Sequence, residues 1–246
     1  MLQPIFREDN WRCFADSGSE FAKQLTSVHH ARSLIEELQT SLKDNHRSCV
    51  KKGKMFNLEV VAKQPRDKNR RKWSRVLSLF REGEAKRMFL ALQLFEQYKI
   101  NSLKPLFLLE KRVFGVIVDS WVVYQFREGT KSDKHALPQI IDILKRIHSK
   151  GHRHDDPNFG NFLRDENGDL FLIDCVLRQR IGSYTDTIDY LLLASINNGV
   201  SIAEVEQLAN PNRLLPGYWL AKCLIGYRSI RARIKAKLRP NRIKNN

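Results

Sequence analysis

Cysteine is scarce in this chain, and long apolar runs are missing. The four cysteines (Cys13, Cys49, Cys175 and Cys223) are scattered, with no C-x-x-C pair and no disulfide-like framework, which favours a reduced, cytoplasmic setting. No apolar stretch approaches the ~18–20 residues that span a bilayer. The charged segment Met1–Trp11 does not have the pattern of a signal peptide. These absences predict a protein that is soluble or that sits on a membrane surface.

Acidic residues are also in short supply. Of 246 residues, 27 are Asp or Glu and 43 are Lys or Arg, which gives a formal net charge of +16. This excess predicts a polyanionic partner: a nucleic acid, an anionic membrane surface or a phosphorylated substrate. Composition alone favours nucleic acid. The hydrophobic content of 42% can fill the core of one large domain or of a two-lobed one.

The stretch from Gly151 to Asp174 carries the strongest functional signal. His154, Asp156 and Asn161 have the spacing H-x-D-x-x-x-x-N, and a polar turn then leads to a short apolar run that ends on Asp174. This is the order of parts in a kinase active site. Phosphoryl transfer needs one carboxylate to accept the proton of the attacking hydroxyl, and a carboxamide with a second carboxylate to hold Mg²⁺. The alternative is an ordinary polar loop, because Asp, Asn and Gly favour turns.

Lys63 is a second candidate, at the end of a predicted strand. The strand follows a Lys-rich segment in which Gly53 is expected to form the turn of a hairpin. Kinases carry a phosphate-binding lysine near the end of such a strand, although an exposed strand-end lysine is the simpler alternative. A helix is predicted over residues 77–98. A carboxylate on this helix, Glu84 or secondly Glu82, would clamp Lys63.

The rest of the chain alternates helical and strand-like patterns. Helices are expected over residues 17–42, 133–150 and 186–198, from a capping box at Ser201, and from Pro216. Strand-like segments fill 106–123, and the break at 127–130 would be a hinge. Arg178 and Arg180 could receive a phosphorylated acceptor. The basic C-terminal segment 228–237 suits an anionic membrane surface or RNA equally well, and it could also be a solvated end.

With Lys63, Asp156, Asn161 and Asp174 in this order, the chain resembles the lipopolysaccharide core heptose(II) kinases of bacteria. These carry a G-D-P-x-x-G-N loop and an I-D strand end. The matching residues here are Asp155-Asp156-Pro157-Asn158-Phe159-Gly160-Asn161 and Ile173-Asp174. The resemblance implies an enzyme, an ATP-dependent phosphotransferase that phosphorylates a heptose hydroxyl of the lipopolysaccharide inner core.

The resemblance also implies roles and an architecture. Asp156 would be the catalytic base, Asn161 and Asp174 would bind Mg²⁺, and Lys63 would be the nucleotide lysine. Glu84, the candidate from the general kinase pattern, would help hold ATP through Lys63. The fold class would be α+β, a two-lobed protein-kinase-like fold with a small β-rich N-lobe and a mostly helical C-lobe. The expected boundaries are 1–123 for the N-lobe, 124–131 for the hinge, and 132–246 for the C-lobe with the catalytic loop and basic C-terminal helix.

The chain departs from the protein-kinase pattern in three places. It has no G-x-G-x-x-G loop before Lys63, only Gly53. Cys175-Val176 follows Asp174 where protein kinases have Phe-Gly, and Asp155 stands where they have Arg. These departures favour a small-molecule or glycolipid kinase over a protein kinase.

The expected substrate and partner is therefore the anionic lipopolysaccharide core. Peripheral contact with the cytoplasmic face of the inner membrane would suit the basic charge, and neither nucleic acid nor an obligate protein partner is expected. Two alternatives stay open. One is a kinase for another sugar, of the Kdo or aminoglycoside type. The other is a non-catalytic kinase-like module that binds polyanions.

Overall fold

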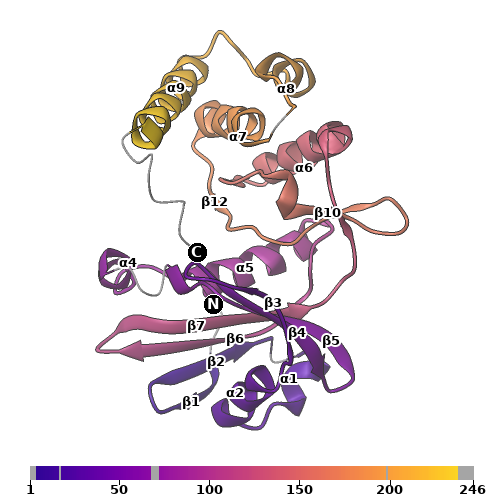
Figure 1. Ribbon diagram of the computed structural model, residues 1–246, viewed down its shortest axis with the longest axis vertical. Coiled ribbons are helices and arrows are strands. Elements are labelled where there is room, and N and C mark those ends of the chain that lie inside the picture. Colours follow the sequence, from indigo (N-terminus) through magenta and orange to yellow (C-terminus); the bar gives the residue numbers. More distant parts are fainter. Residues whose placement is uncertain (1–3, 17, 68–71, 198, 238–246) are drawn as a thin grey trace. The chain divides into compact units, whose positions relative to one another are not determined.

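The computed structural model describes residues 4–16, 18–67, 72–197 and 199–237. They belong to two compact units, Met1–Gly129 with Phe171–Val176, and Thr130–Leu170 with Leu177–Asn246. The first unit contains the large sheet and the second is mostly helical, so the predicted α+β fold class is confirmed (Figure 1). Residues Phe171–Val176 belong to the first unit, although the expected boundaries put them in the second.

A seven-stranded antiparallel sheet in the order β1-β2-β6-β7-β5-β4-β3 forms the first unit. Its strands are β1 (Pro4–Glu8), β2 (Trp11–Ala15), β3 (Thr40–Asp44), β4 (Cys49–Met55), β5 (Leu58–Gln64), β6 (Pro105–Val113) and β7 (Val116–Gln125). Two-residue turns with positive φ at both positions join three strand pairs, at Asp9–Asn10, Phe56–Asn57 and Phe114–Gly115.

Helices cover both faces of this sheet (Figure 1). Helices α1 (Glu20–Gln24) and α2 (Val28–Glu36) pack on one face, where Val60 and Ala62 of β5 join their hydrophobic core. Helix α5 (Glu84–Gln97) covers the other face, and α4 (Lys72–Leu77) precedes it. Because side chains alternate along a strand, Lys63 points to the face that α5 covers.

The expected helix over residues 17–42 was wrong in its length. The chain breaks after α1, and the Ser27 hydroxyl then accepts a 3.0 Å hydrogen bond from the His30 amide to start α2. Beyond α2 the chain turns into the exposed edge strand β3. The Ser27 side chain therefore caps the start of a separate helix, although the helical spacing of apolar residues continues through this point of the sequence.

Gly53 is not the turn of the hairpin. It lies inside β4 opposite Val60, and the turn is Phe56–Asn57. A Cβ at Gly53 would come within 2.7 Å of Leu38 Cδ2. The glycine is therefore required for close packing of the strand, a use that a turn-based prediction misses.

The second unit is built around three longer helices and a short one. Its elements are β8 (Thr130–Lys131), η1 (Lys134–Ala136), α6 (Leu137–Ser149), β9 (His152–Arg153), η2 (Phe159–Asn161), β10 (Phe162–Arg164), β12 (Arg178–Gln179), α7 (Gly182–Ile196), α8 (Ile202–Ala209) and α9 (Pro216–Lys237). Strand β11 (Leu170–Leu172) spans the division between the units. The capping box at Ser201 and the start of α9 at Pro216 are confirmed.

A buried carboxylate ties α8 to α9. Glu206 accepts hydrogen bonds from Tyr218 Oη at 2.5 Å and Arg213 Nη2 at 2.8 Å, and its carboxylate lies 3.1 Å from Lys222 Nζ. Burial acts to raise the pKa of Glu206, but the hydrogen bonds from Tyr218 and Lys222 and the charges of Lys222 and Arg213 leave this pKa below its ordinary value. Within the described part of the chain, no helix is long and apolar enough to cross a membrane.

Candidate functional site

Lys63 forms an ion pair with Asp174 across 111 residues of sequence. Strand β5 presents Lys63, and the segment after β11 presents Asp174. The Lys63 side chain is 18% exposed and that of Asp174 is 44% exposed. An ion pair this accessible to water stabilises a fold by only about 0–1 kcal/mol. The pair therefore leaves an ammonium and a carboxylate available to an incoming ligand at little energetic penalty.

Backbone contacts within the first unit hold Asp174 in place. The segment that precedes it contains Phe171 and Leu172, both fully buried. The Leu172 amide donates to the Asn101 carbonyl at 3.0 Å, and the Leu172 carbonyl accepts from the Leu103 amide at 3.2 Å. Strand β11, which ends two residues before Asp174, is thus joined to the loop after α5, so the position of the carboxylate depends on the core of this unit.

The Asp174 carboxylate affects the pKa of Tyr124 on β7. Burial raises the pKa of the Tyr124 phenol, and the nearby Asp174 carboxylate raises it further. The phenol therefore stays neutral at physiological pH.

The loop after β9 arranges Asp156 and Asn161 in the second unit. Asn161 Nδ2 donates to the Asp156 backbone carbonyl at 2.9 Å, and the Asn158 amide donates to the same carbonyl at 2.8 Å. The Asn158 side chain caps the short helix η2 through the Gly160 amide at 2.8 Å. The Asp156 carboxylate is on an exposed residue. The loop therefore fixes the backbone around Asp156 and leaves its carboxylate and the Asn161 Oδ1 free to face a ligand.

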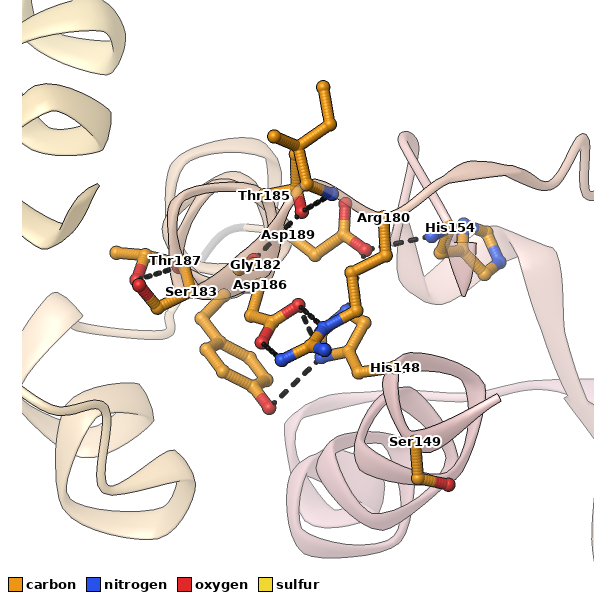
Figure 2. Close-up of polar contacts among 12 residues, drawn as sticks. His148, Ser149, His154, Arg180, Gly182, Ser183, Thr185, Asp186, Thr187 and Asp189 are labelled. Carbon is orange, nitrogen blue, oxygen red and sulfur yellow. Dashed lines mark hydrogen bonds and ion pairs between the residues drawn. The ribbon is translucent and has the colours of Figure 1, made fainter. Parts of the chain in front are cut away.

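Asp189 on α7 anchors this loop through the His154 amide (Figure 2). It is fully buried. Its Oδ2 accepts from the His154 amide at 2.7 Å, and its Oδ1 accepts from the Asp155 amide at 3.0 Å. His148 Nε2 of α6 lies 3.0 Å from the same carboxylate. A buried carboxylate that receives three hydrogen bonds is a strong constraint on the loop backbone.

Asn197 gives the loop a second anchor. The Asn197 side chain, at the end of α7, accepts from the Phe159 amide at 2.8 Å. Its Nδ2 donates to the Pro157 carbonyl at 3.2 Å and to the Leu193 carbonyl at 2.7 Å. Helix α7 thus holds the loop on both sides of Asp156.

The two arginines expected to receive a phosphorylated acceptor have carboxylate partners of their own. Arg178 pairs with Asp155, and Arg180 makes two hydrogen bonds of 2.7 Å to Asp186. Arg153 also pairs with Asp155, at 2.7 Å. These contacts hold the arginines in ion pairs within the second unit, and a role for them in receiving an acceptor stays a prediction.

The glutamates expected beside Lys63 lie in other ion pairs. Glu84 is 2.5 Å from Arg87, and Glu82 is 2.9 Å from Lys86. Helix α5 begins only at Glu84, after the N-cap Gly83, so both glutamates lie at its start rather than along its length. The structure joins Lys63 to Asp174 and not to these residues. A role for Glu84 in nucleotide binding stays a prediction.

Oxygen ligands for a magnesium ion are few. Among the described residues, no three His, Cys, Asp or Glu side chains gather closely enough to hold a metal ion. Magnesium needs only one or two protein ligands when it also binds nucleotide phosphates and water. The Asp174 carboxylate and the Asn161 carboxamide are oxygen donors of this kind, so the predicted ligands fit the chemistry of that ion.

No family model matches the chain, and no curated protein is significantly similar to it. Solved structures do match. One is described as "WaaP in complex with acyl carrier protein", with 13% sequence identity, a TM-score of 0.47, and coverage of 84% of this chain and 91% of that chain. At this identity and score the likeness supports no conclusion about activity, which must come from the residues themselves.

Sequence reasoning missed the anchors of the loop, His148, Asp189 and Asn197. A signal was present for one of them. Asp189 interrupts the apolar series Thr187-Ile188-Asp189-Tyr190-Leu191, and a charged residue on a buried helix face requires partners. His148 and Asn197 carry no comparable signal, because both lie at helix ends, where polar residues are ordinary.

Proposed function

We propose that the protein is an ATP-dependent phosphotransferase that acts on a hydroxyl of an anionic sugar, and that its acceptor is a heptose of the lipopolysaccharide inner core. The observation that carries the proposal is the Lys63–Asp174 ion pair. In this pair an ammonium and a carboxylate lie side by side, and phosphoryl transfer uses groups of these two kinds to hold nucleotide phosphates and a metal ion. The anchored loop around Asp156 and Asn161 supports the same proposal, and so does the resemblance to the heptose kinases.

In the proposed reaction each residue has one task. Asp156 orients the acceptor hydroxyl and accepts its proton, for which its exposed carboxylate is suited. Lys63 holds nucleotide phosphate oxygens, in exchange for part of its contact with Asp174. Asp174 and Asn161 would hold Mg²⁺. When bound, the metal ion neutralises charge on the transferring phosphate. Positioning and charge neutralisation then supply most of the rate.

The net charge of +16 favours an anionic acceptor. A phosphorylated core glycolipid is attracted to such a protein, whereas a cationic aminoglycoside is repelled. A Kdo sugar, which carries a carboxylate, remains an acceptor of the right charge. Of the acceptors considered, the inner core heptose agrees both with this charge and with the resemblance in the loop.

A transfer assay with matched variants tests the proposal. Purified protein is incubated with labelled ATP, Mg²⁺ and core oligosaccharides truncated at successive sugars, and phosphate incorporation is measured by mass spectrometry. Asp156→Asn should reduce turnover by about a hundredfold or more, with an unchanged melting temperature because the residue is exposed. Asp169→Asn, in the exposed turn that follows, is the control and should stay within about twofold of wild type.

Two results would contradict the proposal. Full turnover by Asp156→Asn would show that Asp156 is not the catalytic base. The absence both of transfer to any core and of Mg²⁺-dependent ATP binding would favour the non-catalytic module, whose affinity for any polyanion should fall steeply with salt.

A further inference from the structure

Large apolar side chains gather on the surface of the first unit around α4 and the β6–β7 turn. Phe114 is 98% exposed, Phe80 86% and Trp73 71%, and Val76 and Leu79 are also exposed. These five residues are called the aromatic patch. Backbone hydrogen bonds from Leu79 to Val76 at 3.2 Å and from Phe80 to Leu77 at 3.1 Å continue the turns of α4. Trp73, Val76 and Phe80 therefore follow the spacing of one helical face.

Hydrogen bonds make the patch one surface. Arg112 Nη1 on β6 donates to the Ser78 carbonyl at 3.1 Å and to the Gly115 carbonyl at 2.8 Å. The Ile117 amide on β7 donates to Ser78 Oγ at 2.9 Å. The end of α4 is thus joined to the turn that carries Phe114, and Figure 1 shows α4 beside the ends of these two strands.

The backbone at Phe114 is strained without an internal reason. Phe114 has φ +49° and Gly115 has φ +81°, positions that a two-residue turn normally fills with Asn-Gly or Asp-Gly. Phe56 occupies the same position of another turn, with φ +48°, but there its ring packs 5.2 Å from that of Phe21. Phe114 instead projects into solvent. Strain maintained at an exposed apolar residue points to an external binding partner.

Positive charge adjoins the patch. A cavity of about 350 Å³ between the β1–β2 and β6–β7 turns is lined by Phe114 and by the arginines Arg7, Arg12 and Arg112. Arg7 and Arg12 lie directly opposite each other on β1 and β2, and like charges so placed repel; Glu110 lies opposite Arg12 on β6 and pairs with Arg112 at 2.6 Å. The acids that also line the cavity, Glu8 and Asp9, are within 3.4 Å of His29.

We propose that the aromatic patch is a membrane-docking surface that inserts into the interfacial layer of an anionic bilayer, with lipid phosphates at the arginine-lined cavity. Aromatic side chains at the tips of a helix and a turn suit the headgroup level of a membrane. Arg75 on α4 and Arg81 just after it add positive charge beside the patch, and each cation near an anionic leaflet contributes about 1 kcal/mol. The inference goes beyond the proposed function and does not depend on catalysis.

A fluorescent probe tests insertion directly. Cys13, Cys49 and Cys175 are buried, so Cys223→Ser leaves no exposed cysteine among the described residues. Phe114→Cys in this background is labelled with an environment-sensitive dye and mixed with phosphatidylcholine vesicles that contain phosphatidylglycerol. The emission should shift to the blue and be quenched by nitroxide carried on the lipid chains. Leu214→Cys, at a position 92% exposed in the second unit, is the matched control and should show no shift.

Vesicle sedimentation measures the contribution of the patch. Phe80→Ser should weaken binding to the anionic vesicles by about tenfold, and Leu214→Ser should leave it within about twofold. Both changes lie at exposed positions, so unchanged circular dichroism and melting temperature are expected. Equal emission shifts at positions 114 and 214, wild-type binding by Phe80→Ser, or no binding of the wild-type protein would each overturn the proposal. No nucleotide or acceptor is present, so the result is independent of the kinase assay.

Discussion

Replacing Asp189 with asparagine should loosen the loop that carries Asp156. The carboxylate receives the His154 amide at 2.7 Å on Oδ2 and the Asp155 amide at 3.0 Å on Oδ1. An asparagine has one acceptor oxygen, so one of these buried amides would face an NH₂ group. Losing a charge-assisted hydrogen bond and leaving a buried donor unsatisfied costs about 2–4 kcal/mol in total. Part of this loss of stability is offset, because the substitution also removes the cost of keeping a charged carboxylate buried.

Local and global measurements together test this magnitude. Urea unfolding of Asp189→Asn should show a free energy of unfolding of the second unit reduced by about 2–4 kcal/mol. Hydrogen exchange of the peptide that contains His154 and Asp155 should be faster by a comparable free energy. Asp142→Asn, at an exposed position on α6, is the control and should change stability by less than about 0.5 kcal/mol. If Asp189→Asn were as stable as wild type, with unchanged exchange, the anchoring role would be refuted.

Two further predictions concern the helical unit. Gly217→Ala should destabilise it by about 1–3 kcal/mol, because the added Cβ would lie 2.9 Å from a backbone nitrogen of α7. Gly226→Ala on the same helix meets nothing within 4 Å and should stabilise the unit by up to about 1 kcal/mol. Thermal unfolding compares the two variants, and equal effects would contradict the packing argument. Because the folded-state pKa of Glu206 is lowered, its contribution is present above the unfolded pKa of about 4.3 and is lost as the pH falls through the folded value. Glu206→Gln should therefore show less loss of stability between about pH 5 and pH 3 than wild type in urea unfolding at each pH, and parallel pH profiles would refute this.

The parts of the candidate site that the sequence predicted are those whose signals are local. Lys63 ends one apolar run and Asp174 ends another; the structure has Lys63 as the penultimate residue of β5 and Asp174 two residues after β11. The H-x-D-x-x-x-x-N spacing likewise lies within one loop, and the structure joins Asn161 to the Asp156 backbone. No long-range information was needed for any of these.

The parts that escaped prediction depend on distant residues. Asp189 acts on an amide 35 positions away, and a single sequence contains no measure of that proximity. The start of α5 is set by Gly83, where a Cβ would come within 2.6 Å of Ile117 Cδ1. Helix α5 begins at Glu84, directly after this glycine and not near residue 77, and Glu84 pairs with Arg87 at 2.5 Å.

The return of the chain into the first unit at Phe171–Val176 has a consequence for dissection of the protein. A fragment that ends at Gly129 would contain the whole seven-stranded sheet but would lack Asp174. It would expose the Asn101 carbonyl and the Leu103 amide, which now bond to Leu172. Lys63 would keep its charge on the face beneath α5 without its counter-ion. The first unit is therefore discontinuous in sequence, and no single cut can release it intact.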